Sequence, residues 1–513
     1  MISRRKILKG GAAAVVIASV PFIKPRFTFA QSALPFDYFI SANGDDNNAG
    51  SLASPWSITA LNSKQSTYSG KRIGIIGDIS GTQTPITHGT VGGVQKTLYS
   101  MLAANSNQPC LNVNGGSSSA STYIASCNSS GVYTPRSAII DFANPAGGGI
   151  AAGEGFCIGQ SNTSSTQVPS PGYVTYDALT IRNFNFSAIC FINQGGSSLN
   201  GCVVQNCEIY NGSCASSANN PGAIRYNTVT GMTVKNCKIH DLGTTGGGGS
   251  PRWGFPAIGC YGAAGATYAT VITNNTIYNC TSILQKDSNS DFANCSYNYL
   301  DHGDFGSAAN TDSGIGQGVV VSQQPASGVT SVFHHNICLG PMWLQPQGSS
   351  LLHGTYRIYN NTFYGTPNYP GFELMYCQLG LSGAALQFYN NLAYAANGYY
   401  AYSQYVQIGS IAIANATFNN NVYGNGMTFS VVDDVALSSF AAWQSTTKCD
   451  QNSVLVSSSP FTGTPTAQVS SSFAAGSSAV IAGVMCGALD GSGIVGCDWS
   501  GEPVPAAPSL SVS

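Results

Sequence analysis

The chain has 513 residues and a formal net charge of −2, and only 8% of its residues are charged. Binding to nucleic acid or to an anionic membrane surface needs an excess of Lys and Arg, so the composition argues against both partners. The sixteen cysteines are compatible with an oxidising compartment. Candidate disulfide pairs are Cys110 with Cys127, Cys280 with Cys295, and Cys486 with Cys497.

The first 30 residues predict export. The segment from Ser3 to Lys9, SRRKILK, resembles the twin-arginine export motif. The apolar run that follows, Gly10 to Ile23, is too short to span a membrane. We therefore expect residues 1–30 to be a twin-arginine signal peptide. The mature protein is expected to be periplasmic or secreted and to have no membrane span.

A short pattern recurs between residues 180 and 425, in which an apolar stretch runs into a polar pair, usually Asn-Asn. An apolar residue and then usually a tyrosine follow the pair, and the copies lie 23 to 38 residues apart. Three strands of about five residues with short turns need roughly 22 to 25 residues. The spacing therefore predicts a coil of three parallel strands rather than a helical repeat. The second residue of each pair is the marker of its coil, and the markers are Phe184, Cys207, Cys237, Asn275, Asn298, Asn336, Asn361, Asn391 and Asn420.

The asparagines at the marker position have a structural explanation. At a coil corner an amide can bond the backbone of its own turn and the amide of the next coil, about 4.8 Å away. Each such bond contributes about 1 kcal/mol. We expect Asn275, Asn361 and Asn391 to lie in one buried column, in which Cys207 and Cys237 replace asparagine in two coils.

This repeat resembles that of the pectate-lyase-like superfamily, the proteins with the pectin lyase fold. Residues 37–56, DYFISANGDDNNAGSLASPW, resemble the opening of many secreted β-helix proteins, and residues 476–483, GSSAVIAG, resemble their closing segment. The resemblance implies an all-β fold, a right-handed parallel β-helix with about 9–12 coils and with N- and C-terminal caps. We expect residues 31–513 to form one domain, with a capping insertion at 79–135 and a C-terminal cap at 424–513.

Two insertions interrupt the repeat at the same offset. The first inward residue of the next strand comes 8 residues after Asn275, but 21 residues after Cys237 and after Asn298. The inserted segments are 241–256 and 302–318. Long loops on one edge of a rigid scaffold often carry binding sites, so we expect these two to wall a groove across the coil between them.

Alternation along the third strand of each coil predicts the floor of this groove. With Ile224, Ile258, Ile283, Val319 and Leu344 inward, the predicted outward residues are Arg225, Gly259, Leu284, Val320 and Gln345, and, two positions further, Asn227, Tyr261, Lys286, Ser322 and Gln347. Lys286 would then lie between the insertions. Residues 282–298, SILQKDSNSDFANCSYN, resemble the strand that bears the catalytic lysine of the chondroitinase B and alginate lyase group. The metal-binding carboxylates that precede the lysine in that group are missing from residues 282–285.

The resemblance implies a polyuronide lyase that acts by β-elimination. A base removes the proton beside the uronate carboxylate while a cation neutralises that carboxylate. Lys286 is the expected base, and a second set of proton-transfer candidates lies where His240 and Asp301 replace the recurring tyrosine, at the roots of the insertions. The expected site comprises catalytic Lys286, Arg225, His240 and His302; substrate-binding Arg252, Trp253, Tyr261 and Tyr278; and Asp287, Asp291, Asp304 and Asp312 as ligands for calcium.

Two other functions stay open. A polygalacturonase-like glycoside hydrolase would use clustered aspartates, and Asn310-Thr311-Asp312 resembles its first motif, although the later motifs are missing. A non-catalytic carbohydrate-binding or surface matrix protein is favoured by the low charge. In each case we expect a monomer whose partner is an acidic polysaccharide or oligosaccharide, with calcium as the candidate cofactor.

Overall fold

The computed structural model describes residues 35–80, 90–91, 94–95, 98, 109–143, 155–162, 172–193, 199–214, 221–243, 255–261, 269–286, 292–301, 320–322, 328–340, 342–344, 354–365, 375–377, 384–395, 405–408, 416–424, 427–431, 435–437, 439–459 and 461. Among these residues, no helix is long and apolar enough to cross a membrane. The predicted signal peptide, residues 1–30, lies outside the described residues.

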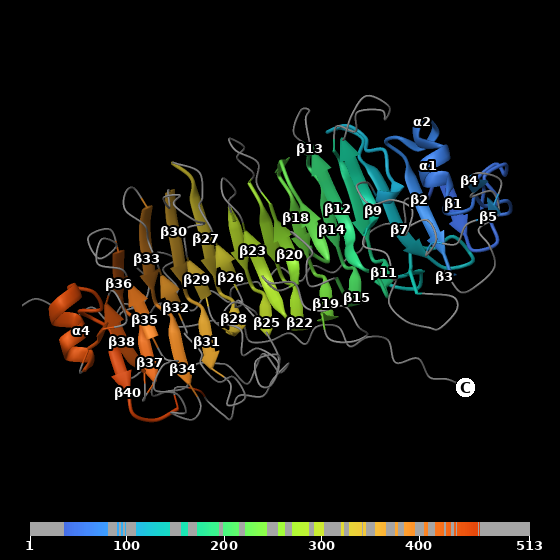
Figure 1. Ribbon diagram of the computed structural model, residues 1–513. Coiled ribbons are helices and arrows are strands. Elements are labelled where there is room, and N and C mark those ends of the chain that lie inside the picture. The colour runs from blue at the N-terminus through green and yellow to red at the C-terminus, as the bar shows by residue number, and fades with distance from the viewer. Residues whose placement is uncertain are drawn as a thin grey trace, which may run out of the picture. The chain divides into compact units, whose positions relative to one another are not determined.

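Three 12-stranded sheets make up the fold (Figure 1). The first sheet contains, in spatial order, β1 (Tyr38–Ser41), β2 (Arg72–Ile76), β7 (Thr122–Cys127), β10 (Val174–Asp177), β14 (Val203–Gln205), β18 (Thr233–Lys235), β21 (Val271–Thr273), β24 (Asn294–Ser296), β27 (Thr330–His334), β30 (Gly354–Tyr359), β33 (Ala384–Tyr389) and β36 (Ala416–Asn419). The second contains β3 (Asp78–Ser80), β8 (Ile139–Asp141), β11 (Thr180–Arg182), β15 (Glu208–Gly212), β19 (Lys238–Leu242), β22 (Thr276–Cys280), β25 (Tyr299–Asp301), β28 (Ile337–Leu339), β31 (Thr362–Gly365), β34 (Leu392–Ala395), β37 (Val422–Gly424) and β40 (Val454–Val456). The third contains β6 (Pro109–Asn112), β9 (Gly155–Asn162), β12 (Phe186–Asn193), β16 (Ile224–Tyr226), β20 (Pro256–Cys260), β23 (Ser282–Lys286), β26 (Val320–Ser322), β29 (Met342–Leu344), β32 (Met375–Cys377), β35 (Tyr405–Ile408), β38 (Thr428–Val431) and β39 (Val435–Ala436).

The chain visits the three sheets in turn, as in β18, β19 and β20 followed by β21, β22 and β23. Within these sheets the described pairs are parallel except for β38 with β39. The predicted coil of three parallel strands is therefore confirmed, and the fold is a right-handed parallel β-helix. Two small pairs lie outside these sheets, β4 (Thr90–Val91) with β5 (Val94–Gln95) and β13 (Leu199–Asn200) with β17 (Val229–Thr230).

Residues of the same kind stack on one another in the core from coil to coil. In the second sheet, Ile181, Ile209, Ile239 and Ile277 pair directly from strand to strand, and all four are fully buried. Burying one such side chain contributes about 1.5–3 kcal/mol. The residues on either side of each isoleucine point away from the core, which places the row that begins with Arg182 and Tyr210 on the outer face of this sheet.

The predicted asparagine column is confirmed. Asn275, Asn361 and Asn391 are fully buried, together with Asn298, Asn336 and Asn421. Each side-chain amide donates to the carbonyl oxygen of the next: Asn275 to Asn298 at 3.0 Å, Asn298 to Asn336 at 2.9 Å, Asn336 to Asn361 at 3.0 Å, Asn361 to Asn391 at 3.1 Å and Asn391 to Asn421 at 3.3 Å. The residue before each ladder position has a left-handed backbone, with φ near +55° at Asn274, Asn360 and Asn390. Asparagine tolerates this conformation better than most residues, which explains the recurring pair.

The predicted markers at the two ends of the repeat are wrong: Phe184 lies one corner away from the ladder position, and Asn420 lies one residue before it. Asn420 is the left-handed residue of its pair, with φ 56°, and Asn421 occupies the ladder. In the first copy Leu179 holds the equivalent position, because Thr180 pairs with Glu208, whereas Phe184 follows the next strand. Tyr423 therefore pairs with Ala393 and is buried in the core. It is not equivalent to the tyrosines that follow the polar pair in other coils and lie on the outer face.

The ladder ends on the buried carboxylate of Asp450. Its Oδ1 accepts from Asn421 Nδ2 at 2.9 Å and from Ser453 Oγ at 2.5 Å, and its Oδ2 accepts from Trp443 Nε1 at 2.9 Å and from Tyr423 at 3.1 Å. The ladder amides all donate in the direction of Asp450, so the positive end of this row of dipoles faces an anion. Burial nevertheless raises the pKa of Asp450 above its ordinary value.

Short helices pack at both ends of the described sheets. Near the N-terminal strands, α1 (Ala60–Ser63) and α2 (Gln65–Tyr68) bury Leu61 and Tyr68. Near the C-terminal strands, α4 (Phe440–Thr447) buries Trp443 against Phe418 and Phe429. Strands β6 and β7 lie within residues 79–135 and extend the third and first sheets, so this part of the expected insertion belongs to the coils.

Two of the three candidate disulfides are wrong. Cys110, Cys127, Cys280 and Cys295 are free buried thiols. Burial raises the pKa of the Cys127 thiol to about 12, which makes it unreactive near neutral pH. The third pair, Cys486 with Cys497, lies outside the described residues.

Candidate functional site

Both predicted insertions leave the solenoid at the same corner. The first connects β19 to β20 and the second connects β25 to β26, so each leads from the second sheet to the third. In the coil between them, β22 and β23 are joined by Thr281 alone. The common corner is confirmed, whereas the greater part of both insertions lies outside the described residues and the groove between them stays a prediction.

The predicted floor of the groove is wrong by one residue in β23. Ile258 pairs with Leu284, and Cys260 pairs with Lys286. Leu284, predicted to point outward, is fully buried. Lys286 therefore stands in the register row of Tyr226 and Cys260, both buried, rather than in an outward row. The hydrogen bonds of β23 to β20 set its register, and the number of residues after the marker Asn275 does not.

Arg225 and Tyr261 contact each other on the third sheet. The guanidinium carbon of Arg225 lies 5.4 Å from the centroid of the Tyr261 ring and 5.8 Å from that of Phe186. Tyr261 is only 4% exposed, and its hydroxyl donates to the backbone oxygen of Pro221 at 2.6 Å. Tyr261 therefore lies on the same outward face as Arg225 and Gly259, as predicted, but its ring is covered rather than exposed, and Arg225 is half-buried.

Several predicted site residues lie outside the described residues, and for Lys286 only the backbone is described. The residues outside are His302, Arg252, Trp253, Asp287, Asp291, Asp304 and Asp312. Within the described segments, no group of three or more His, Cys, Asp or Glu side chains is placed to hold a metal ion. Calcium binding by the four aspartates stays a prediction.

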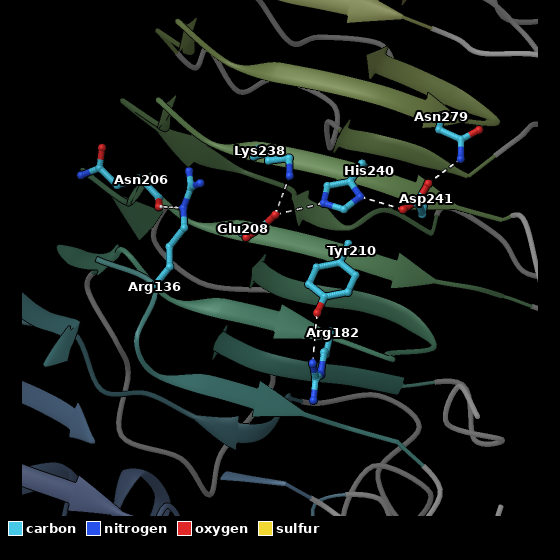
Figure 2. A network of polar contacts seen from close by, with 9 residues as sticks. All are labelled: Arg136, Arg182, Asn206, Glu208, Tyr210, Lys238, His240, Asp241 and Asn279. Carbon is cyan, nitrogen blue, oxygen red and sulfur yellow. Dashed lines mark hydrogen bonds and ion pairs between the residues drawn. The ribbon is translucent and has the colours of Figure 1, made fainter. Parts of the chain in front are cut away.

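The structure instead draws attention to His240, on the outer face of the second sheet (Figure 2). Register pairing aligns Arg182, Tyr210, His240 and Tyr278 on four neighbouring strands, β11, β15, β19 and β22. The His240 ring lies parallel to both tyrosine rings, with centroids 5.0 Å from Tyr210 and 4.8 Å from Tyr278. Parallel strands repeat at about this distance, so the stack follows from the register.

A chain of ionic contacts surrounds His240. Its Nδ1 lies 2.8 Å from Asp241 Oδ2, and its Nε2 lies 3.2 Å from Glu208 Oε1. The same Glu208 oxygen accepts from Lys238 Nζ at 2.8 Å. With only 8% of the residues in the chain charged, four adjacent ionisable groups form an unusual concentration. His240 itself is 8% exposed, because the two tyrosine rings cover its faces and the two carboxylates contact its nitrogens.

The contacts shift the acid–base properties of the cluster, which we define as Glu208, Lys238, His240 and Asp241. The hydrogen bond from His240, followed by the contact with Lys238, outweighs partial burial and lowers the pKa of Glu208 to about 2. Burial alone would lower the pKa of Lys238, but the contact with Glu208 outweighs it and the pKa is raised. Both groups are therefore charged at neutral pH.

The side chain of Asp241 is fixed from a second direction. Asp241 has a left-handed backbone, with φ 54°, as do Asn211 and Asn279 at the same corner of the neighbouring coils. Asn279 Nδ2 donates to Asp241 Oδ1, which leaves Oδ2 directed at His240. A short second ladder of polar side chains thus orients the carboxylate that orients the imidazole.

A further ion pair borders the cluster. Arg182 Nε donates to Asp141 Oδ2 at 2.8 Å, and its Nη1 donates to the Tyr210 hydroxyl at 3.1 Å. The contacts with Tyr210 and Asp141 raise the pKa of Arg182 although burial opposes them. Arg182 therefore places a permanent positive charge one coil from the cluster.

Sequence reasoning found His240 and Tyr278 but missed Glu208, Lys238 and Arg182. The signal for two of them was present, because Glu208 and Lys238 each directly follow a marker cysteine, Cys207 and Cys237. Equal offsets from equivalent markers place two residues side by side in adjacent coils. An acidic and a basic residue at this offset predict an ion pair.

Acidification should weaken the fold through Glu208. Its pKa in the folded protein, about 2, lies below the ordinary value of 4.5. The stabilising effect is therefore fully present above about pH 4.5 and is lost as the pH falls towards 2. Glu208→Gln should cost roughly 1–2 kcal/mol at pH 7, after allowance for partial solvent screening, and little at pH 2.5. Urea unfolding of both proteins at the two pH values measures this difference, and a constant difference would contradict the assignment.

Similarity to known proteins reaches only the level of the fold. The sequence matches no protein-family model and no curated protein. Among solved structures, it is similar to a GH136 lacto-N-biosidase from Eubacterium ramulus, with 13% identity and a TM-score of 0.40 over 82% of this chain and 66% of that one. It is also similar to a rhamnogalacturonan lyase, with 13% identity and a TM-score of 0.38 over 75% and 87% of the two chains. An exopolygalacturonase from Thermotoga maritima shows 10% identity and a TM-score of 0.31 over 79% and 94%. Likeness at this level does not identify a reaction.

Proposed function

We propose that this protein acts on an acidic polysaccharide and cleaves it by β-elimination at the outer face of β15, β19 and β22. The observation that carries the proposal is the Asp241–His240 contact of 2.8 Å, beside a lysine and two phenols. A carboxylate on one ring nitrogen orients the imidazole and leaves the other nitrogen to exchange a proton. Here that nitrogen is Nε2, which faces Glu208.

Each part of the elimination has a candidate group in the cluster or beside it. Lys238 contacts the same Glu208 oxygen as His240 and would neutralise the uronate carboxylate. In the resting cluster Nε2 donates to Glu208, so Glu208 would take that proton as the substrate displaces it. Nε2 would then accept the proton from the carbon beside the uronate carboxylate. Burial raises the pKa of Tyr278, so its phenol stays protonated and can donate a proton to the departing glycosidic oxygen.

Glu208 must move for the substrate to reach His240. It contacts Nε2 at 3.2 Å but Lys238 at 2.8 Å, so the contact with His240 is the longer of the two. A uronate carboxylate carries the same charge as Glu208 and would compete with it for the two cations. The site would therefore select acidic over neutral sugars.

The same reaction could take place at either of two sites. The second-sheet site is the cluster around His240, and the third-sheet site is the predicted one around Lys286 and Arg225. The latter keeps Lys286 as the base and Arg225 as the carboxylate partner, with His302, Arg252 and calcium held by the four aspartates in the insertions. The register of Lys286 beside buried Cys260 weighs against it. The contacts of His240 favour the second-sheet site.

A non-catalytic carbohydrate-binding protein is the second candidate function. The specific observation in its favour is that both ring nitrogens of His240 already contact carboxylates and that the ring is 8% exposed. In that case the cluster holds neighbouring coils together and the surface around it binds the glycan.

Incubation with a panel of polyuronides, with and without calcium, tests the proposal. A lyase releases products with an unsaturated, ultraviolet-absorbing sugar, and we expect this absorbance to increase with at least one acidic polymer. New reducing ends without absorbance would show a hydrolase instead. Binding without cleavage would support the non-catalytic alternative, and the absence of both binding and cleavage would refute activity on these polymers.

A further inference from the structure

Two histidines meet at the corner after β27. His334 ends the strand, and His335 follows with a left-handed φ of 54° at the position that Asn274, Asn360 and Asn390 hold in other coils. The Nδ1 atoms of the two rings lie 2.7 Å apart. This distance is a hydrogen bond, so one Nδ1 carries a proton and the other does not. We call these residues the His pair.

The neighbouring amides define which nitrogen donates. His334 Nε2 lies 3.0 Å from Asn294 Oδ1, an acceptor, so this nitrogen carries hydrogen. Asn360 Nδ2, a donor, lies 3.4 Å from His335 Nε2, so that nitrogen accepts. The remaining proton of His335 is then on Nδ1 and is donated to His334 Nδ1. Every ring nitrogen has a matching partner when both histidines are neutral.

Each histidine ring also stacks on a tyrosine ring. Tyr297 stacks on His335 with centroids 5.0 Å apart, and Tyr359 stacks on His334 with centroids 4.9 Å apart. Asn294 and Tyr297 belong to the preceding coil, whereas Tyr359 and Asn360 belong to the following one. The His pair therefore joins three consecutive coils. The first of these coils carries the second insertion, between β25 and β26.

We propose that the His pair is an acid-sensitive contact. It stabilises the packing of these three coils when both rings are neutral and destabilises it when both rings are protonated. A rotation of the Asn360 amide can accommodate one extra proton on His335 Nε2. A second proton cannot be accommodated, because it would place two N–H groups against each other across 2.7 Å. His335 is also buried, which disfavours its charged form.

The sign of the pH effect follows from proton counting. Two histidines in the unfolded chain bind two protons below about pH 6.5, whereas the folded pair binds at most one. The contribution to stability is thus fully present above about pH 6.5 and falls as the pH decreases. The groups described against the pair are the phenols of Tyr297 and Tyr359 and the amides of Asn294 and Asn360, and the amides do not titrate.

Asparagine at position 335 provides the test variant. Asn suits the left-handed backbone, as Asn360 and Asn390 show at the same corner, and it does not titrate. Urea unfolding of the mature wild-type protein and of His335→Asn should be compared between pH 8 and pH 5. We expect the unfolding equilibrium constant of the wild type to increase by up to about tenfold more per pH unit below pH 6.5 than that of the variant. Identical pH dependence in the two proteins would overturn the proposal.

Hydrogen exchange of the wild type supplies a test that needs no variant. At pH 5.5, amides in residues 330–339 should lose protection relative to pH 7.5, once intrinsic exchange rates are corrected. Residues 256–260 of β20, remote from the His pair in sequence and in another sheet, are the matched control. Equal loss in the two segments, or none in either, would show that the pair is not the acid-sensitive element.

Discussion

Replacing His240 by glutamine is expected to lower the rate of polyuronide cleavage by roughly 10²- to 10⁴-fold, the usual effect of removing a general base. Glutamine cannot accept the proton, although it can still bond Asp241 or Glu208. Because the cations of the site remain, substrate binding should change much less than turnover. The expected signature is a large fall in kcat with a nearly constant KM.

Two further variants make this result interpretable. Lys286→Ala removes the base predicted for the third-sheet site, so the larger loss identifies the sheet on which cleavage occurs. Tyr364→Phe is the control, because Tyr364 stacks on Tyr394 in the same outer row, several coils from His240. It should leave kcat unchanged. An active enzyme with normal kcat after loss of His240 would refute the second-sheet site.

Removing one amide from inside the asparagine ladder is expected to destabilise the fold by roughly 3–5 kcal/mol. Asn361 is the best position, because its Nδ2 donates to the backbone oxygens of Phe333 and Tyr359, both at 3.0 Å, as well as to Asn391. Its Oδ1 accepts from the backbone and side chain of Asn336. Alanine leaves these buried groups without partners, and each orphaned group costs about 1–3 kcal/mol before relaxation.

The urea midpoint of Asn361→Ala, compared with the wild type, measures this effect. Asn47→Ala is the matched control, since Asn47 is exposed in a turn and its substitution should cost less than about 0.5 kcal/mol. If both variants lost equally little stability, the ladder would contribute no more than surface asparagines do.

The sequence by itself determined the coil, its three parallel strands and the buried asparagine column. These features repeat, and a repeated pattern marks equivalent positions without knowledge of distant contacts. Asn361 and Asn391 were identifiable because stacked coils demand the same residue at the same corner. The marker residue could not be chosen from the sequence where several asparagines follow one another. In the run Asn419 to Asn421, any of the three fits the marker.

Only the tertiary structure decided the orientation of the third strands and the composition of the candidate site. Lys286 was assigned by counting from its marker, but pairing with β20 sets its register, and this pairing depends on hydrogen bonds between coils. His240 was visible as a break in the tyrosine row. Its partners were not, because Glu208 lies 32 residues earlier and meets His240 only when two coils stack. The repeat in the sequence shows which residues occupy equivalent positions. Contacts between different residues of neighbouring coils, such as Glu208 with His240, depend on how the coils stack.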